Sequence, residues 1–527
     1  MKKGKRLFYS ILITFLVGFV IYYLFLPPIN IHSEAFWFFA IILITLFGFI
    51  NFGAGITGIR TKEFDLKNKL NYAPFVAPLI IICLILIITF INGPIFNAKK
   101  YANRIKVENA NFASEIKEVD FNTLAIVDRD SSSKLGDRVM GSMGELVSQF
   151  DVSNMYTQIN YNDEILRVTP LDYSDIIKYF TNRKSGIPGY VTVNSVTGEA
   201  KLVKLKKGMK YSENSLFFEN VRRKLRFKYP FEIFGDLSFE IDNNGDPYWI
   251  MPTIKYSGVG QREDINGIIT LNAVTGESKK YDIASIPTWV DHVYSPTLII
   301  DQVDDWGGYV NGFINTIFGQ KGMKMTTDGY NYIAMNDDIY MYTGITSIVS
   351  DESNLGFILT NLRTKETKFF DCPGAEEYSA MDSARGQVQQ MNYTSSFPIL
   401  INLANRPTYV ISLKDDAGLV KMYAFVDVAD YQKVVVTDAS AGIQNAANNY
   451  LNNNGIEVDG KELEITIADI KIATIDGNTY YYIIDTENNK YRVSIKINPK
   501  KLPFLKNGDK LLITSDNSEV HEIFKLK

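Results

Sequence analysis

Hydrophobic and polar positions divide the chain into an apolar first part and a long mixed part. Three stretches carry no charge, and each has the roughly 20 residues that a helix needs to cross a ~30 Å hydrocarbon layer. They are LFYSILITFLVGFVIYYLFL (7–26), AFWFFAIILITLFGFINFG (35–53) and PFVAPLIIICLILIITFIN (74–92). We therefore predict a three-helix membrane anchor over residues 1–93, with membrane lipids covering residues 7–92. The first stretch does not fit a cleaved signal peptide, because PPINIHSE follows it rather than a small-residue cleavage motif.

Basic residues on either side of these stretches predict the orientation. Four precede the first helix and four lie in the loop 60–73, whereas the loop 27–34 has none; the eight are Lys2, Lys3, Lys5, Arg6, Arg60, Lys62, Lys67 and Lys69. By the positive-inside rule the N-terminus is cytoplasmic and the residues after 93 are extracytoplasmic, in a multi-pass cell-membrane protein. The basic residues 99–106 oppose this orientation, but long domains cross the membrane largely regardless of such charges.

Charge and cysteine content narrow the classes of partner. Residues 94–527 carry nine more acidic than basic side chains, so we expect no nucleic-acid binding, which depends on clustered Lys and Arg. Cys83 falls in the third apolar stretch and Cys372 stands alone beyond it. The exterior part must therefore fold without an internal disulfide. The overall composition is typical of a bacterial envelope protein from a low-GC genome.

A short phrase repeats in the exterior part. GYVTVNSVTGEA (189–200) and GIITLNAVTGES (267–278) share seven of their first eleven residues at a spacing of 78. Each predicts a β-hairpin in which Gly198 or Gly276 takes a positive φ. A weaker third copy, GFILTNLRTKETKFF (356–370), has Lys365 in place of the glycine. A fourth hairpin is predicted over 408–428, with its turn at Asp416 to Gly418.

Amphipathic segments precede two of these hairpins. Phe217, Val221 and Leu225 recur at helical spacing in 215–230, and a similar face occurs in 373–390. The repeating unit is then one helix followed by three or four antiparallel strands, which gives an α+β fold. We predict five segments: the membrane anchor 1–93, a juxtamembrane α+β segment 94–185, a first α+β module 186–285, a second α+β module 286–440 and a small β-barrel 456–527.

The barrel prediction comes from short alternating strands with turns between them. About five strands fit into the last 70 or so residues, which suits a small closed barrel of OB or SH3 type. Turns are expected at Asp476-Gly477, Asn488-Asn489 and Asn507-Gly508. The alternation slips between Ile467 and Ile470, so a bulge or bend is expected there.

The helix, the DPYW strand (246–249) and the LNAVTGE hairpin together resemble the PepSY type of extracytoplasmic domain. The resemblance covers residues 185–285 and, more loosely, 355–430. It implies a binding or inhibitory module of the kind attached to peptidases, or an envelope protein that acts through a partner.

Motifs with known chemistry are weighed against simpler explanations. GAGITG (53–58) matches a dinucleotide-binding fingerprint, but it follows a membrane helix instead of a strand. FEIDNNGDPYW (239–249) resembles half of a calcium loop, but Met251 stands where the last carboxylate belongs. His292 and Cys372 are the only pair that suggests a catalytic dyad, and no nucleophile motif accompanies them. We predict no catalytic residue, no metal and no cofactor.

The stretch 286–320 has the most unusual composition in the exterior part. It combines Trp289, Trp306, Tyr309 and Phe313 with Gly307, Gly308 and Gly312. One interpretation is a core crossing between sheets. The other is an aromatic-lined groove made by these four residues, or an amphipathic segment that rests on the membrane or on a partner.

These observations predict a non-enzymatic binding or scaffold protein displayed outside the membrane, with an envelope protein as its partner. The first alternative is a sensor or regulatory subunit that acts through a partner's membrane helices, since the cytoplasmic segments are too short for an output domain. An envelope enzyme is the second alternative, for which carboxylates converging in a deep cleft would be the evidence. The sequence leaves homo-oligomer formation open.

Overall fold

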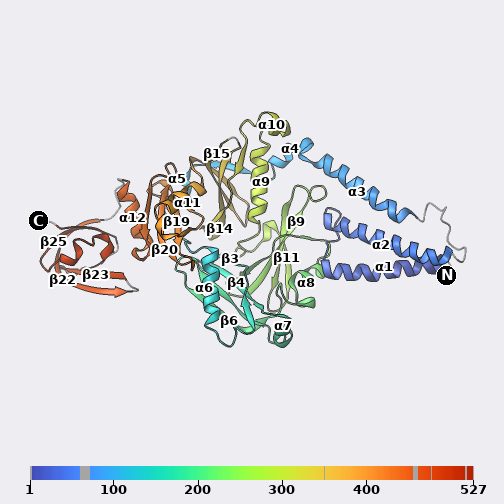
Figure 1. Cartoon of the computed structure of the whole chain (residues 1–527), viewed down its shortest axis with the longest axis horizontal. Coiled ribbons are helices and arrows are strands. Elements are labelled where there is room, and N and C mark those ends of the chain that lie inside the picture. The colour runs from blue at the N-terminus through green and yellow to red at the C-terminus, as the bar shows by residue number, and fades with distance from the viewer. Residues whose placement is uncertain are drawn as a thin grey trace. The chain divides into compact units, whose positions relative to one another are not determined.

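The computed structural model describes residues 3–59, 72–348, 350–454, 461–475, 478–516 and 519–525 (Figure 1). The chain divides into two compact units. One comprises residues 1–109, 127–351 and 358–369, and the other comprises 110–126, 352–357 and 370–527. The basic loop residues on which the predicted orientation depends, Arg60, Lys62, Lys67 and Lys69, lie outside the described residues.

Three helices at the start of the first unit are long and apolar enough to cross a membrane, as the sequence predicts. They are α1 (Lys3–Phe25), α2 (Glu34–Ile59) and α3 (Ala73–Asn92). α1 packs closely on α2 at Gly18, where a Cβ would lie 2.8 Å from a methyl carbon of Leu43. The glycines of GAGITG belong to the last turns of α2, so a helix leads into this motif where a nucleotide site needs a strand. The short α4 (Pro94–Ala102) follows α3 after Gly93.

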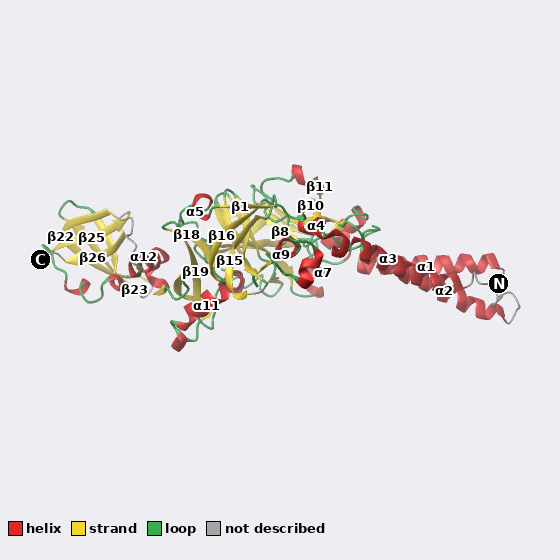
Figure 2. Cartoon of the chain, turned by 90° about the horizontal axis from the view of Figure 1, so that it is seen from above, coloured by secondary structure: helices red, strands yellow, loops and turns green. Residues whose placement is uncertain are grey.

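Strands make up much of the chain beyond α4 (Figure 2). Four of the sheets that they form share one strand order. Within each sheet the first and second strands both pair with the third, the third pairs with the fourth, and the fourth with the fifth. In the first sheet the strands are β2 (Phe150–Val152), β3 (Thr157–Tyr161), β4 (Glu164–Tyr173), β5 (Ile187–Asn194) and β6 (Ala200–Met209). In the second they are β7 (Ile233–Phe234), β8 (Ser238–Ile241), β9 (Pro247–Lys255), β10 (Asp264–Asn272) and β11 (Ser278–Asp282).

The third and fourth sheets repeat the order. The third contains β12 (Lys324–Thr326), β13 (Asn331–Met335), β14 (Asp338–Ser347), β15 (Ser350–Asn361) and β16 (Thr367–Ala375), with β1 (Val107–Ala110) added beside β16. The fourth contains β17 (Thr394–Ser395), β18 (Ile399–Leu403), β19 (Arg406–Lys414), β20 (Val420–Asp427) and β21 (Val434–Asp438). β15 and β16 contribute residues to both compact units.

A helix precedes each sheet. These helices are α6 (Arg129–Gly141), α8 (Val221–Lys228), α9 (Pro296–Gly308) and α11 (Glu377–Gly386). A further helix, α7 (Ile176–Asn182), connects β4 to β5. The mixed α+β class expected from the sequence is therefore confirmed.

The repeated turn closes the same hairpin in the first two sheets, between the fourth and fifth strands. The Asn194 side chain accepts the backbone N–H groups of the two residues that follow Ser195, each at 2.9 Å. Asn272 does the same at 3.0 and 2.9 Å. Gly198 and Gly276 have φ values of +75° and +71°, so the predicted positive φ is confirmed at both positions.

The third sheet keeps this turn without the glycine. Asn361 accepts the backbone N–H groups of Arg363 and Thr364, both at 2.9 Å, and Lys365 takes a φ of +66°. The side-chain cap, more than the glycine, is thus the common element of the three turns.

The predicted fourth hairpin over 408–428 is confirmed, but it is not equivalent to the other three. The turn at Asp416 to Gly418 joins the third and fourth strands of its sheet, not the fourth and fifth. At the equivalent position Asp427 replaces the asparagine: its carboxylate accepts the N–H of Asp430 at 3.0 Å, and its own N–H donates to the carbonyl of Lys433. Sequence comparison selected the other hairpin because DDAG is a typical turn sequence, whereas VADYQK contains no glycine.

The strand pairings also shift the predicted segment boundaries. The boundary at 185/186 falls between β4 and β5, which pair over Leu166–Pro170 and Tyr190–Asn194. The first sheet therefore begins before residue 186, and residues 286–440 contain two sheets of the series instead of one. Only the turn between the fourth and fifth strands requires particular residue types. The helices and first strands of the repeats therefore have the same arrangement but no common sequence.

The predicted helix over 215–230 is divided. A short 3₁₀ turn, η2 (Phe217–Glu219), precedes α8, and the Asn220 side chain caps α8 by accepting the N–H of Arg223 at 3.0 Å. Val221 and Leu225 are buried as expected, but Phe217 is exposed and has a φ of +51°. The cap starts the helix after Phe217, which removes that residue from the apolar face.

The C-terminal strands pair in a closed circuit in the order β22-β23-β24-β26-β25 and back to β22. Their bounds are β22 (Lys461–Ile475), β23 (Asn478–Asp485), β24 (Lys490–Ser494), β25 (Lys510–Asp516) and β26 (Glu519–Lys525). The register of β22 shifts between Ile467 and Asp469, where a bulge was expected. Asn488 and Gly508 take positive φ at two of the predicted turns, and Asp476-Gly477 lies outside the described residues. Helix α12 (Ile443–Asn453) precedes this segment.

Candidate binding cleft

Two adjoining cavities lie in the first unit: the larger has a mostly polar lining, and the smaller is lined by residues of the first three sheets. Their volumes are about 440 and 310 Å³. They share five lining residues, which come from the loop after β7, from β9 and from the segment that leads into α9: Asp236, Pro252, Val293, Ser295 and Thr297. Together they form one cleft, which we call the polar cleft. Ser295 is fixed at its edge because its hydroxyl caps α9 by accepting the N–H of Leu298.

Gln158 on β3 is the most unusual residue of the polar cleft. Its side chain is 1% exposed, yet neither its amide nitrogen nor its amide oxygen has a hydrogen-bond partner among the described residues. The hydroxyl of the nearby Tyr156 is also buried and unpartnered there. A buried amide without partners costs roughly 1–3 kcal/mol, so this wall of the cleft is suited to a bound polar group that would pair with it.

His292 holds the backbone of this wall in place. Its Nε2 lies 2.7 Å from the carbonyl oxygen of Gln158, and its ring meets Tyr332 edge to face at 5.7 Å. Burial lowers the pKa of His292 to about 4, so the ring is neutral and Nε2 carries the proton that it donates to the carbonyl. His292 is thereby a positioning residue, since its Nε2 is engaged by a backbone carbonyl.

Carboxylates line the larger cavity. Asp236, Glu263 and Asp301 all contribute to its wall, together with Arg222. Burial raises the pKa of Glu263, and the charges of Asp236 and Asp301 add to this effect. The Tyr256 hydroxyl donates to Glu263 at 3.2 Å. In the described part of the chain, no group of three or more His, Cys, Asp or Glu side chains is arranged to hold a metal ion.

The four residues of the predicted aromatic groove are separated by their contacts. Trp289 packs on Tyr248 with ring centroids 5.0 Å apart, and Trp306 packs on Phe369 at 6.2 Å. Both flank the core that joins the second and third sheets through Val290, Ile299 and Val303.

Tyr309 instead contacts Tyr101, which follows α3 in the chain. Phe313 begins α10 (Phe313–Phe318), whose Ile314, Ile317 and Phe318 are exposed. The core interpretation of 286–320 therefore holds for the two tryptophans, whereas the end of the stretch is an exposed apolar helix.

The other candidate motifs have structural explanations. In the calcium-like segment, Asp242 accepts the N–H groups of Asn244 and Asp246 at 2.9 and 3.0 Å and so closes a tight turn. Burial raises the pKa of the Cys372 thiol to about 11, which keeps it protonated and unreactive near neutral pH.

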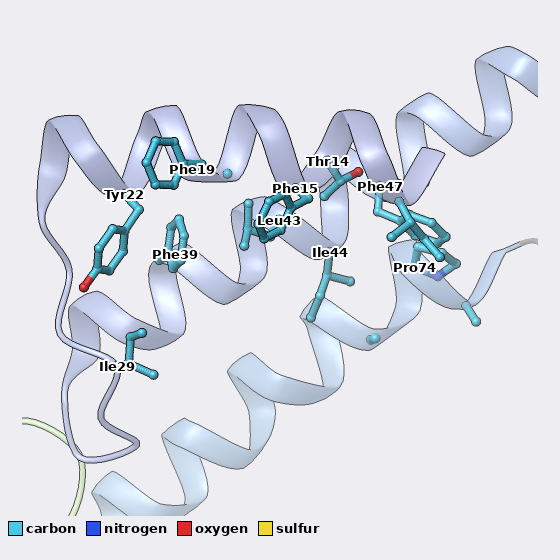
Figure 3. Close-up of a pocket in the computed structure, with 14 residues that line it drawn as sticks. Thr14, Phe15, Phe19, Tyr22, Ile29, Phe39, Leu43, Ile44, Phe47 and Pro74 are labelled. Atoms are coloured by element: carbon cyan, nitrogen blue, oxygen red, sulfur yellow. The ribbon is translucent and has the colours of Figure 1, made fainter. Parts of the chain in front are cut away.

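An apolar groove of about 750 Å³ lies among the three membrane helices. Figure 3 shows Phe15, Phe19 and Tyr22 of α1 facing Phe39, Leu43 and Phe47 of α2, with Pro74 of α3 nearby. Its side chains match acyl chains or an apolar helix and offer almost no polar group to a soluble ligand.

Comparison with known proteins adds no assignment. No protein-family model and no curated protein matches the sequence. Among solved structures, the chain is similar to Trypanosoma rangeli sialidase in complex with the inhibitor DANA (9% identity, 72% of this chain and 54% of that chain, TM-score 0.17). It is also similar to a B. megaterium levansucrase (10%, 78% and 98%, TM-score 0.17). The chain spans about half the length of the sialidase, and TM-scores this low carry no argument about fold or function.

Sequence patterns could not have found the polar cleft. Gln158, Asp236 and Tyr332 belong to no motif, and they lie on strands and loops of three different sheets. The one signal was the unusual composition of 286–320, because Val293, Ser295 and Thr297 of this stretch line both cavities.

Proposed function

We propose that this chain is a membrane-anchored binding protein of the bacterial cell envelope, with the polar cleft as its ligand site. The buried, unpartnered amide of Gln158 is the observation that carries the proposal. The cleft is polar, holds both acidic and basic side chains and has tyrosines at its edge. A ligand with hydroxyl and amide groups, such as a saccharide or peptide portion of an envelope component, suits this lining.

The N-terminus is then cytoplasmic, and residues after 93 face the outside of the cell membrane. The three apolar helices support the membrane location, and the basic residues at their ends support the orientation. Protease added to intact, wall-stripped cells should degrade the exterior part and leave a fragment about as long as residues 1–93. Protection of the exterior part until lysis would reverse the orientation.

The repeating sheets are proposed to be PepSY-like and the C-terminal segment to be an OB-type barrel. The helix before each sheet supports the first assignment. The strand circuit β22-β23-β24-β26-β25 supports the second, because an OB fold pairs its strands in the order 1-2-3-5-4-1. Four sheets of one plan then form a scaffold, and the cleft arises where three of them meet.

Photo-crosslinking in living cells tests the binding site. A benzophenone amino acid replaces Tyr330, an exposed residue at the edge of the cleft, and in a matched strain it replaces the similarly exposed Tyr431 of the second unit. We expect an adduct with one envelope component at position 330 only, and its loss when Gln158→Leu is added. An adduct that persists in Gln158→Leu, or equal adducts at both positions, would contradict the cleft as the site.

A sensor or regulatory subunit is the alternative supported by the membrane groove. Its apolar lining would accept a partner's helix, which could carry a signal that the exterior part cannot deliver alone. Phe39→Ala would then disturb co-purification with a membrane partner and leave crosslinking at position 330 intact.

The three carboxylates of the larger cavity support an envelope enzyme as a second alternative. Glu263, with its raised pKa, would be the acid, and Asp236 or Asp301 the base. Turnover of wall fragments that is lost in both Glu263→Gln and Asp236→Asn would favour this alternative over binding alone.

A further inference from the structure

The basic helix α8 lies against the outer end of α1. The Phe227 ring contacts three α1 aromatic rings, with centroids 6.4 Å from Phe19, 5.5 Å from Tyr22 and 6.2 Å from Tyr23. Arg226 donates from Nε to the carbonyl of Leu26 at 2.9 Å. Figure 1 shows α8 beside this end of α1. These contacts fix α8 and η2 at the level of the last two turns of α1.

That level lies at the edge of the bilayer. α1 has 23 residues, which at 1.5 Å per residue gives about 34 Å, slightly more than a ~30 Å hydrocarbon core. Phe19 lies about 9 Å before the helix end by the same rise. Side chains that touch Phe19 to Tyr23 therefore reach the boundary between headgroups and acyl chains.

Large apolar side chains are exposed around this contact. Six of them are between 49% and 69% exposed and form what we call the interfacial patch: Ile176, Ile177, Phe180, Phe217, Phe218 and Phe231. Ring contacts connect the patch to α1, because Phe180 lies 6.4 Å from Phe217 and Phe218 lies 5.9 Å from Tyr23. Phe231 adjoins the loop after α1, since the Asn30 amide donates to its carbonyl at 3.0 Å.

Backbone conformation and charge favour the same surface. Phe217 holds a φ of +51°, which is strained for a bulky residue and persists only when the surroundings impose it. α8 carries five basic residues and no acidic one in the sequence VRRKLRFK. Aromatic side chains next to Arg and Lys are typical of segments that lie in the headgroup region.

A second apolar surface lies next to α3. α10 packs against α4, which begins directly after Gly93, and Phe96 of α4 meets Phe90 of α3 at 5.4 Å. Ile314, Ile317 and Phe318 of α10 are all exposed, Phe318 by 84%.

We propose that the interfacial patch and α10 are inserted into the headgroup and upper acyl region of the same bilayer that α1 to α3 cross. Their partner is a lipid surface. The patch is continuous with α1 through ring contacts, and the basic residues of α8 complement lipid phosphates. The exterior part of the first unit therefore rests on the membrane and is not suspended from it by flexible linkers.

Lipid quenching in reconstituted full-length protein tests this. Cys83 and Cys372 are replaced by alanine, and single cysteines labelled with bimane are introduced by Phe180→Cys, Phe231→Cys or Phe318→Cys. The vesicles contain equimolar phosphatidylcholine and phosphatidylglycerol, with a nitroxide on a shallow or a terminal acyl carbon. Leu24→Cys on α1 is the membrane control. Glu199→Cys is the exterior control. Its turn packs on α6, because Gly198 adjoins Leu135. α6 lies farther from α1 than α8 does (Figure 1).

The shallow nitroxide should quench bimane at positions 180, 231 and 318 as it does at position 24, and the terminal nitroxide should quench all three less. Position 199 should not respond. Adding Ile177→Ser and Phe217→Ser should abolish quenching at position 180, while position 24 and the melting temperature stay unchanged.

Two results would overturn the proposal. One is quenching confined to position 24. The other is a blue-shifted bimane at positions 180 and 318 that lipid nitroxides do not quench, because a second copy of the chain, and not lipid, would then cover these surfaces.

Discussion

The carboxylate of Glu240 on β8 accepts the backbone N–H of Asp291 at 2.8 Å, and Asp291 in turn accepts the backbone N–H of Asn160 on β3, also at 2.8 Å. This relay of two buried acids joins the second sheet to the first through the segment 286–295. These two acids are adjacent to the polar cleft, since His292, which lines the cleft, donates its backbone N–H to Glu240.

The buried acids predict a pH-dependent stability. Burial raises the pKa of Glu240 and the pKa of Asp291. The negative charge of Glu240 raises the pKa of Asp291 further. The folded state therefore keeps protons that the unfolded state has already released above the ordinary glutamate value of 4.5. These two acids should therefore lower the free energy of unfolding as pH rises from there toward neutrality, by about 1.4 kcal/mol for each unit of raised pKa. His292, whose pKa burial lowers to about 4, contributes in the opposite direction up to its ordinary value of 6.5.

Urea unfolding of the full-length protein across this pH range measures the effect. Glu240→Gln should make the slope of the unfolding free energy against pH more positive, because it removes a group that keeps its proton in the folded state. Glu199→Gln, a substitution of an exposed carboxylate, should leave it unchanged. An unchanged slope in Glu240→Gln would contradict the prediction, because Glu240 would then titrate alike in the folded and unfolded states.

The two equivalent glycines should tolerate alanine unequally. A Cβ at Gly198 would meet only ordinary contacts, the nearest at 3.6 Å from Leu135, whereas at Gly276 it would lie 2.3 Å from the Tyr211 ring. Positive φ alone costs an alanine about 1 kcal/mol. We expect about that loss of stability for Gly198→Ala and a clearly larger one for Gly276→Ala, measured by urea unfolding.

Tyr211→Ala in the Gly276→Ala background separates the two causes. It should recover the steric part of the loss and leave the part due to φ. Equal losses at both glycines would mean that Tyr211 moves aside without cost.

The third turn depends on an ion pair. Arg363 binds Asp338 through two hydrogen bonds at 2.6 and 2.7 Å, and the Asn361 amide adds a third at 2.8 Å. Arg363→Met would leave a nearly buried carboxylate without its cation and should cost about 2 kcal/mol of stability, less than a fully buried pair because Arg363 is partly exposed.

Adding Asp338→Asn to Arg363→Met should recover part of that loss. Lys368→Met is the control: it removes the cation that pairs with Glu366, a carboxylate far more exposed than Asp338. This change should cost under about 1 kcal/mol. Both substitutions can be compared by hydrogen exchange of β14 and β15. Similar costs for Arg363→Met and Lys368→Met would argue against a structural role for the buried pair.

Truncating a buried side chain in the core of the C-terminal strand circuit should destabilise this circuit. Ile513 is fully buried, so Ile513→Ala should cost about 2–5 kcal/mol. Ile472, on β22 of the same circuit, is 61% exposed, and Ile472→Ala should have little effect. Hydrogen exchange over residues 461–525 should accelerate in the first variant only; comparable acceleration in both would refute the closed core.

The sequence predicted the elements whose signals are local. Three uncharged stretches predicted α1 to α3 because a helix in lipid must be apolar on every side. The VTGE phrase predicted two turns because positive φ favours glycine. The phase slip near Ile467 predicted the bulge in β22, since strand alternation must restart where an extra residue is inserted.

By itself, then, the sequence determined the membrane helices, the α+β class and the repeated turn. Only the tertiary structure shows four sheets with the same strand order, each preceded by a helix. The helices and first strands of these four repeats have no common sequence from which the order could be predicted. The tertiary structure also decided the polar cleft, where Gln158, Asp236 and Thr297 meet only after three sheets pack, and the interfacial patch, whose Phe180 and Phe231 become neighbours of the membrane only when α8 docks on α1. These sites depend on burial and exposure, which the spacing of residues along a chain does not specify.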